Sequence, residues 1–439
     1  MSAQQQFSAL TAALCAGLSA GEELFVRLTG EDSDFVRVSH AQVRQAGHVA
    51  QRRLGLALVV GQRQAEAWID LGGEATTDLQ RAREAINQLR AVLPLLPEDP
   101  YLNWHRGADR HERIDQNLLP DPTTTVAEAL QEAGNLDLVG VWASGATHAG
   151  FASSHGQSAW HTVYSCSFDW SCHRSDGQAL KGVRAGTTWD RAAWRATMER
   201  ARTELRQFDQ PRRRVEPGMY PVFLAPAAVH DLVGLLGWGG YSAKARKTRT
   251  SPLMRFESGQ AKMSSLVTLR EDAATGFAPA ITAHGFHCPD SVTLINRGVC
   301  GESLVSARTA REYAMVTNSD AEYPLSLRME PGELPTADAM RALDLGIWIS
   351  NLHYLNYSDR SACRVTGMTR FACWWVENGE AVAPIEHMRF DDDLFGLFGD
   401  RLTALTREVE LIPDTSTYDE RSLRTYEVPG ALTGMKFTL

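Results

Sequence analysis

Two short clusters of histidine and cysteine carry the side chains that proteins most often use to bind zinc. His284-Gly-Phe-His-Cys288 places two imidazoles and one thiol in a single short segment, and Cys166, Cys172 and His173 form a second cluster. Catalytic zinc sites take about three such ligands plus water. Neighbouring side chains on an extended chain point to opposite sides, so His287 and Cys288 share a metal only at a sharp bend. Structural roles are therefore favoured over metal binding for both clusters.

Other catalytic patterns are missing from the sequence. It contains no Gly-x-Ser-x-Gly nucleophile elbow, no phosphate-binding loop with its lysine, and no Gly-x-Gly-x-x-Gly after a strand. Gly237-Trp-Gly-Gly-Tyr241 is rich in glycine but lacks the lysine and hydroxyl that hold a phosphate and magnesium. Arg110-His111-Glu112 begins like a zinc-binding helix, yet no histidine follows at the required offset. We expect the first segment to be a loop and the second a surface segment.

Length and charge limit the classes of protein to consider. A chain of 439 residues is longer than one hydrophobic core usually serves, which predicts two domains. Its formal net charge of -9 argues against nucleic acid as the main partner, since phosphate binding needs a clustered positive surface. Arginines 212–214 and the basic residues between 244 and 249 are expected in a solvated linker and loop.

The apolar segments indicate a protein outside the membrane. No window reaches the roughly 18 to 20 consecutive apolar residues that a membrane span needs. The first residues lack the positive and apolar regions of a secretory signal. The seven cysteines form no disulfide-like spacing, as expected of reduced thiols. These features predict a cytoplasmic location.

Hydrophobic periodicity predicts mixed helices and strands in the first half of the chain. The expected helices are 7–18, 79–93, 126–133 and 189–208. The expected strands are 23–28, 35–43, 47–60, 65–71, 138–144, 150–154 and 158–171. The turn-rich, charged segment 210–218 is the best linker candidate.

Short strands and glycines dominate beyond the linker. We expect strands at 220–224, 266–269, 291–296, 325–329, 346–352, 371–377 and 385–390. Helical patterns remain at 226–236, 336–343 and 392–405. The fold class is therefore α+β, with a mixed N-terminal α/β domain over 1–210 and a β-rich C-terminal domain over 219–439.

The order of several short segments resembles a known family. They include Asn351-Leu-His-Tyr-Leu-Asn-Tyr-Ser-Asp-Arg-Ser-Ala-Cys-Arg-Val-Thr-Gly367, Thr293-Leu-Ile-Asn-Arg-Gly298, Leu345-Gly-Ile-Trp-Ile-Ser350 and Val376-Glu-Asn-Gly379. Together they resemble the TldD/PmbA family of intracellular metallopeptidases, and more closely its PmbA (TldE) branch than the metal-carrying TldD branch. The resemblance implies a barrel-like C-terminal domain.

The resemblance also bears on the segment 228–236. In the TldD branch this helix reads His-Glu-x-x-x-His. Here His230 matches the first histidine and Asp231 the glutamate, but Leu235 stands at the second histidine. The last residues, 428–439, contain no cysteine at the TldD-branch ligand position. The resemblance therefore implies a branch without the metal-binding motif, in which His230 and Asp231 are a surface pair or contact a ligand.

The function implied is that of one subunit in a peptidase complex. By analogy a TldD-like partner holds zinc, while this chain carries no cofactor and positions unfolded or leader peptides for trimming. Peptides bind sheet edges through main-chain groups, and Asn356 and Gly367 are the candidate substrate-binding residues. Two alternatives stay open, namely a self-sufficient hydrolase with a metal at His284, His287 and Cys288, and a noncatalytic homodimeric peptide-binding protein.

Overall fold

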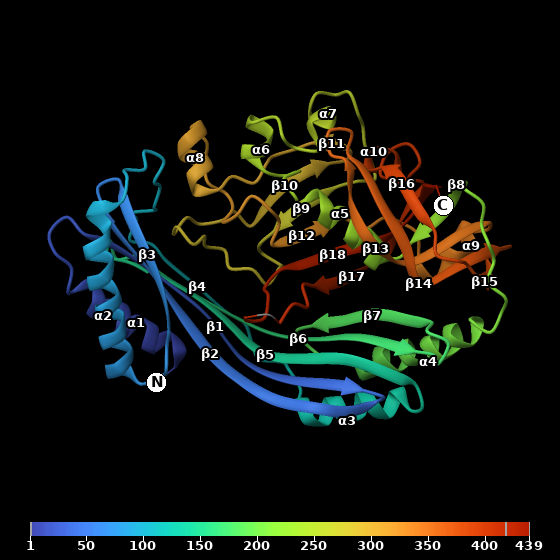
Figure 1. Cartoon of the computed structure of the whole chain (residues 1–439), viewed down its shortest axis with the longest axis horizontal. Coiled ribbons are helices and arrows are strands. Elements are labelled where there is room, and N and C mark those ends of the chain that lie inside the picture. The colour runs from blue at the N-terminus through green and yellow to red at the C-terminus, as the bar shows by residue number, and fades with distance from the viewer. Residues whose placement is uncertain (1, 418, 439) are drawn as a thin grey trace.

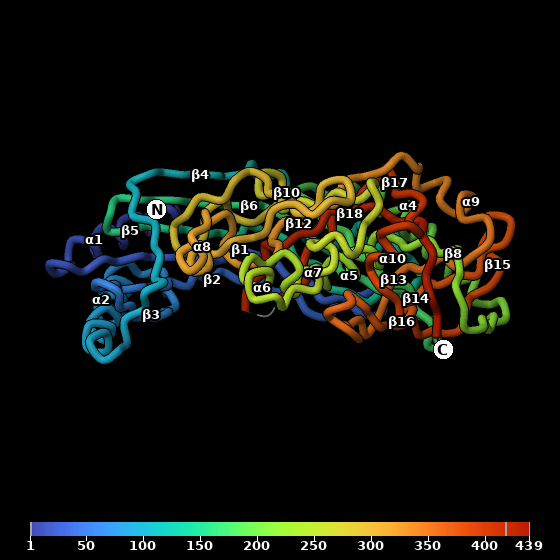
Figure 2. Tube along the Cα trace, turned by 90° about the horizontal axis from the view of Figure 1, so that it is seen from above, coloured from blue at the N-terminus to red at the C-terminus, as the bar shows by residue number. Residues whose placement is uncertain are grey.

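The fold is α+β and is built around two sheets. It is described from a computed structural model, which covers residues 2–417 and 419–438. An N-terminal domain of long, curved strands lies beside a strand-rich C-terminal domain (Figure 1). The molecule is elongated, with α1 (Ala3–Cys15) and α2 (Ala75–Val92) at one end of the long axis (Figure 2). At the other end lie α9 (Ala339–Leu343) and β15 (Glu380–Pro384).

Among the described residues, seven strands form the N-terminal sheet in the order β3-β2-β1-β5-β6-β4, with β7 also paired to β6. They are β1 (Glu23–Ser39), β2 (Gln42–Val60), β3 (Arg63–Asp70), β4 (Arg110–Ile114), β5 (Asp137–Ser153), β6 (Ser158–His173) and β7 (Ala179–Gly186). The pairing of β5 with β6 is unbroken from Asp137 opposite His173 to Ala152 opposite Ser158.

Alternation along β1 assigns the two faces of this sheet. Leu24, Val26 and Leu28 are buried in one cluster with α1 and α2. Val36 and Val38, on the same face, belong to a second cluster with α3 (Pro122–Ala133) and α4 (Arg191–Gln207). The opposite face meets the C-terminal domain, where Ile281 packs against the cluster of Phe25 and Arg421 donates to Ser33, so β1 is covered on both faces.

Two long strands correct the predicted boundaries in this half. The expected strands 23–28 and 35–43 belong to the single hairpin of β1 and β2, and 138–144 and 150–154 are both parts of β5. Polar residues of the segment between the expected strands 23–28 and 35–43 are buried inside β1, because the C-terminal domain covers that face. Glu31 is 2% exposed and Ser33 is fully buried. Strand β7 was not predicted.

The C-terminal sheet contains eleven strands in the described part of the chain. Besides β15 they are β8 (Gly218–Leu224), β9 (Leu269–Asp272), β10 (Ser291–Asn296), β11 (Val299–Cys300), β12 (Ser326–Met329), β13 (Gly346–Asp359), β14 (Arg364–Glu377), β16 (Arg389–Asp393), β17 (Ala404–Pro413) and β18 (Thr425–Phe437). The short helices are α5 (Pro226–Leu236), α6 (Ala243–Lys247), α7 (Met254–Glu257), α8 (Ala307–Tyr313) and α10 (Leu394–Leu397), with 3₁₀ turns at Leu93–Leu95 and Thr336–Asp338.

Five of these strands close into a ring. In order, β8, β13, β14, β16 and β18 are hydrogen-bonded neighbours, and β18 pairs back to β8 from Ala431 opposite Leu224 to Phe437 opposite Gly218. Closure satisfies edge groups that an open sheet would leave exposed. The expected barrel-like character of the C-terminal domain is thereby confirmed.

Two predictions in this half were wrong. The expected helix 392–405 contains only the short α10, and β17 begins at Ala404. Gly399 explains the break, because a Cβ there would lie 1.9 Å from the Phe395 carbonyl oxygen. The expected strand 385–390 lies mostly between β15 and β16 and overlaps β16 only at Arg389 and Phe390. In the described ranges, no helix is long and apolar enough to cross a membrane.

Candidate functional site

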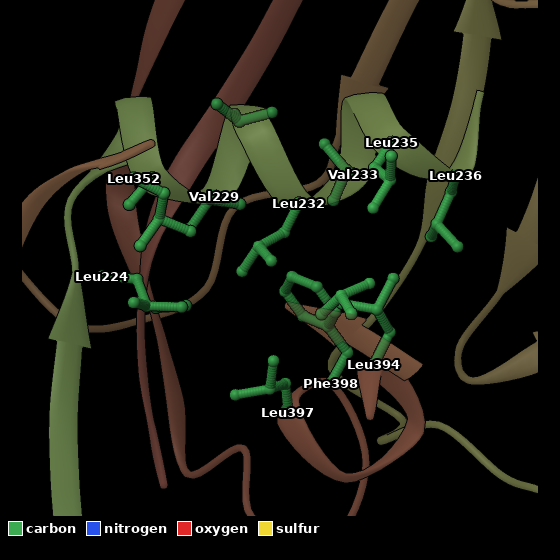
Figure 3. Close-up of a cluster of buried hydrophobic side chains, with 14 of the residues drawn as sticks. Leu224, Val229, Leu232, Val233, Leu235, Leu236, Leu352, Leu394, Leu397 and Phe398 are labelled. Atoms are coloured by element: carbon green, nitrogen blue, oxygen red, sulfur yellow. The ribbon is translucent and has the colours of Figure 1, made fainter. Parts of the chain in front are cut away.

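Helix α5 carries His230 and Asp231 at the surface of the C-terminal domain. Its bounds agree with the predicted helix, starting with Pro226 in the first turn and ending before Gly237. The apolar side of α5 packs into the main C-terminal core, where Leu232, Val233 and Leu235 face the α10 region (Figure 3). The His230 and Asp231 side chains stay 27% and 34% exposed.

Leu235 decides whether this helix fits a zinc ion. Its side chain is 4% exposed and is part of the hydrophobic core. It offers no lone pair, and its position is filled by packing against neighbouring apolar residues (Figure 3). The residues of α5 therefore do not fit the two-histidine zinc motif. In residues 2–417 and 419–438, no group of three or more His, Cys, Asp or Glu side chains is placed to hold a metal ion.

The imidazole of His230 rests on Tyr426 of β18. The two ring centroids are 4.5 Å apart and the planes meet at 85°, an edge-to-face contact. Tyr426 is only 8% exposed. Nδ1 of His230 lies 3.4 Å from Oδ1 of Asp231. This packing fixes the histidine ring while leaving it accessible.

Glu271 belongs to the same face of the sheet. Leu327 of β12 pairs with Tyr426 on one side and with Glu271 of β9 on the other, so the three side chains form a row. The Glu271 carboxylate accepts backbone N–H groups of Leu325 and Ser326, both at 3.0 Å. Burial raises the pKa of Glu271 to about 7, against the opposing effect of these donors.

An arginine and a tyrosine lie next to this row. The Arg424 guanidinium lies 4.6 Å from the ring centroid of Tyr323, which is 43% exposed. Burial raises the pKa of Tyr426, and the charge of Arg424 opposes this shift. The arrangement brings together a partly exposed imidazole, a largely buried phenol and a buried carboxyl group whose pKa is raised. Imidazole, phenol and carboxyl groups can all hydrogen-bond the N–H and C=O groups of a peptide backbone.

Sequence reasoning missed Glu271 and Tyr426. The expected strand 266–269 ended before Glu271, and no strand was predicted around Tyr426. One signal was present, since Glu271 alternates with Leu269 and so occupies a core-facing position. A carboxylate at such a position is unusual enough to mark it for attention.

The residues of the first histidine–cysteine cluster have separate surroundings. His284 packs on Trp104, with ring centroids 4.6 Å apart. His287 is exposed and faces His111 instead. Cys288 is buried, which raises its thiol pKa to about 12.

The second cluster is distributed along β6. Cys166 and Cys172 are both buried against the α3 and α4 side, and burial raises their pKa values to about 11 and about 12. Six residues of a strand span roughly 20 Å, too far for a shared metal. His173 is exposed and lies 2.9 Å from the Ser171 hydroxyl.

Asn356 and Gly367 lie on the β13–β14 hairpin. Asn356 is exposed, and its side-chain oxygen accepts the Tyr357 N–H at 2.8 Å. Gly367 is buried opposite Phe390 of β16, and a Cβ there would lie 2.7 Å from the Phe390 ring. The pairing register shifts between His353 and Asn356, which leaves Tyr354 79% exposed with a positive φ of 52°. Such bulges redirect side chains away from the regular ladder.

Comparison with known protein families finds a match in the C-terminal half of the chain. Residues 217–431 match the family described as PmbA/TldA metallopeptidase C-terminal domain. No curated protein matches the sequence.

The whole chain is also similar to solved structures. TldE from Thermococcus kodakarensis is 14% identical, with a TM-score of 0.80 over 98% of this chain and 99% of that one. A candidate modulator of DNA gyrase from Thermotoga maritima is 12% identical, with a TM-score of 0.77 over 100% of both chains. A second such candidate, from Bacteroides thetaiotaomicron, is 14% identical with a TM-score of 0.73, covering 99% of this chain and 98% of that one.

The fold and the site define a two-domain α+β protein with a ring-closed C-terminal sheet. The match over residues 217–431 then confirms the resemblance seen in the sequence, and the chain carries a C-terminal domain of the TldD/PmbA family. Its overall fold is that of the TldE structure.

Proposed function

We propose that this chain is the substrate-positioning subunit of a TldD/TldE-type heterodimeric zinc metallopeptidase. A TldD-like partner supplies the catalytic zinc, and this chain supplies surface that orients unfolded or leader peptides for trimming in the cytoplasm. The proposal follows the family of the C-terminal domain and its metallopeptidase description.

Leu235 is the observation that carries the proposal. In the TldD branch the corresponding position holds the second histidine of the metal motif. In this chain a buried leucine occupies it and contributes to the core, so the helix brings one imidazole, that of His230, in place of two. A catalytic zinc therefore belongs to another subunit in this proposal.

His230 and its neighbours are the proposed peptide-facing groups. The ring is held at the surface by Tyr426, and an imidazole in that position hydrogen-bonds a peptide carbonyl or amide group. The bulged β13–β14 hairpin, with exposed His353 and Tyr354, offers further contact surface. The assignments of Asn356 and Gly367 to substrate binding stay predictions.

Peptide cleavage by separate and combined subunits tests the proposal. The chain alone, a TldD-like partner alone and the two copurified are assayed on an unfolded peptide with zinc supplied to each. We expect efficient cleavage only with both subunits, and loss of cleavage when the partner's zinc ligands are replaced. A chain that cleaves by itself would instead support the self-sufficient hydrolase.

A point substitution tests positioning separately. We expect His230→Ala to raise the KM of the complex for peptide while leaving its zinc content unchanged, because the imidazole orients substrate without binding the metal. His173→Ala, which removes an exposed histidine of the N-terminal domain, is the matched control and leaves KM unchanged. A complex that forms normally, yet never cleaves peptides, would favour the noncatalytic peptide-binding alternative.

A further inference from the structure

Two histidines from different domains meet at the junction between the sheets. His111 lies on β4, the edge strand that runs parallel to β6. Its neighbour on the same face, Arg113, donates to the Gly276 carbonyl at 2.9 Å, so this face of β4 is turned toward the C-terminal domain. His287 ends a tight turn of that domain, in which it pairs with Ile281.

The two rings are held in contact through their nitrogens. Nε2 of His287 lies 3.3 Å from Nδ1 of His111, and the ring centroids are 4.8 Å apart with planes at 85°. Either ring can donate to the other, depending on which tautomer each adopts. In both cases a ring nitrogen from each domain is present within 3.3 Å of the other.

This separation also suits a metal ion. With a zinc–nitrogen distance of about 2.05 Å, two nitrogens 3.3 Å apart subtend an angle of about 107° at the metal, close to the tetrahedral angle. Neutral imidazole nitrogens are preferred ligands of Zn²⁺, Ni²⁺ and Cu²⁺. Binding replaces one weak hydrogen bond by two coordinate bonds, and each ring must turn so that its nitrogen points to the metal instead of to the other nitrogen.

Other histidines near this junction have different partners. Nε2 of His105 lies 2.7 Å from an Asp109 oxygen, and Nε2 of His155 lies 2.8 Å from a Glu23 oxygen. The corresponding nitrogen of His161 lies 2.9 Å from the Phe277 carbonyl. These contacts occupy those rings, whereas His111 and His287 face each other.

We propose that Nδ1 of His111 and Nε2 of His287 bind one divalent transition-metal ion, with Zn²⁺ as the expected metal and water completing its coordination. The ion links β4 of the N-terminal domain to the 281–287 turn of the C-terminal domain. The ion ties together residues that are 176 positions apart in the sequence.

This site goes beyond the proposed function. It lies on the domain junction and not on α5, and it departs from the expectation that this chain holds no metal. Zinc bound here without peptide cleavage by the chain alone leaves the proposed subunit role intact. The two proposals therefore fail independently.

Zinc titration of the purified full-length chain tests the site. After chelator treatment and dialysis, calorimetry is expected to show one Zn²⁺ per chain, and zinc is expected to raise the unfolding temperature. His287→Ala and His111→Ala each remove a direct ligand. The zinc affinity of each variant should fall by more than the roughly 10–100-fold that is caused by loss of a residue hydrogen-bonded to a ligand. Because His287 is exposed, its substitution is expected to leave the fold intact.

A matched variant and a spectroscopic count complete the experiment. His173→Ala removes an exposed histidine far along β6 and is expected to bind zinc as the wild type does. Electron paramagnetic resonance of the Cu²⁺ form should show two coordinated imidazole nitrogens in the wild type and one in His287→Ala. Equal zinc affinity in the wild type and both junction variants, or no zinc binding by the wild type, would overturn the proposal.

Discussion

Glu271 is a buried carboxyl group with a pKa raised into the physiological pH range. It sits in the row with Leu327 and Tyr426, and its burial raises its pKa from 4.5 to about 7. The folded chain therefore holds this proton more tightly than the unfolded chain. The contribution of Glu271 to stability is most favourable at or below pH 4.5, declines as pH rises toward 7, and is constant above that.

Substitution of Glu271 by glutamine removes this pH dependence. Between pH 5 and pH 8 the wild type is expected to lose about 2.5 kcal/mol through this residue, since each pKa unit corresponds to about 1.4 kcal/mol. Glu271→Gln keeps an oxygen for the Leu325 and Ser326 N–H groups but does not titrate. Urea unfolding at several pH values measures the difference, with the exposed Glu380→Gln as control. Parallel pH curves for the wild type and Glu271→Gln would contradict the prediction.

The packing of strand β14 depends on a glycine, Gly367, at a position that has no room for a side chain. Gly367 lies between β13 and β16, and the Phe390 ring occupies the space in which a Cβ would stand. We expect Gly367→Ala to destabilise the chain by about 1–3 kcal/mol, because the ring must shift in a packed barrel. Gly47→Ala on β2 is the matched control, since its Cβ meets nothing within 4 Å. Chemical denaturation compares the two, and equal stabilities would mean that the barrel adapts at no cost.

The helices and the strands differ in how far the sequence predicts them. Helix α5 has a proline in its first turn and a glycine after its end, both local signals, and its predicted bounds agree with the structure. Strand β18 contains Pro429, Gly430 and Gly434, which read as turn residues. It is nevertheless a strand, because Pro429 lies beside a register irregularity with β17, where a missing N–H is tolerated.

The candidate site was predictable only in part, because some of its residues come together through strand pairing and not through a local pattern. His230 and Asp231 follow from the pattern of one helix, and Leu235 follows from the same helix. Glu271 and Tyr426 come together only through β12, so their proximity depends on the pairing of strands that are remote in sequence. No local pattern reports such pairing.

At the scale of the whole molecule, the loop between β17 and β18 carries one of the contacts that hold the two domains together. Arg421 of this loop reaches the face of the N-terminal sheet opposite its helices. Its guanidinium donates to the Ser165 carbonyl at 2.9 Å and the Ser165 hydroxyl at 2.7 Å. It also donates to the Gly145 carbonyl and the Ser33 hydroxyl, both at 3.3 Å. Burial lowers the pKa of Arg421, while the charge of Glu31 opposes the shift.

Removal of this guanidinium is expected to loosen the domain junction more than the domains themselves. Arg421→Ala leaves buried acceptors of three strands without their charged donor, at a cost of about 2–3 kcal/mol. Arg421→Lys restores the charge but not the fork that reaches several acceptors, so we expect it to recover little. Hydrogen exchange should rise in peptides containing Ser33, Gly145 and Ser165 and stay unchanged in the β8–β18 ring. Arg407→Ala, which removes an exposed arginine within the C-terminal domain, controls for the loss of charge. Uniform exchange changes across both domains would mean that Arg421 supports global stability, and that other contacts hold the domains together.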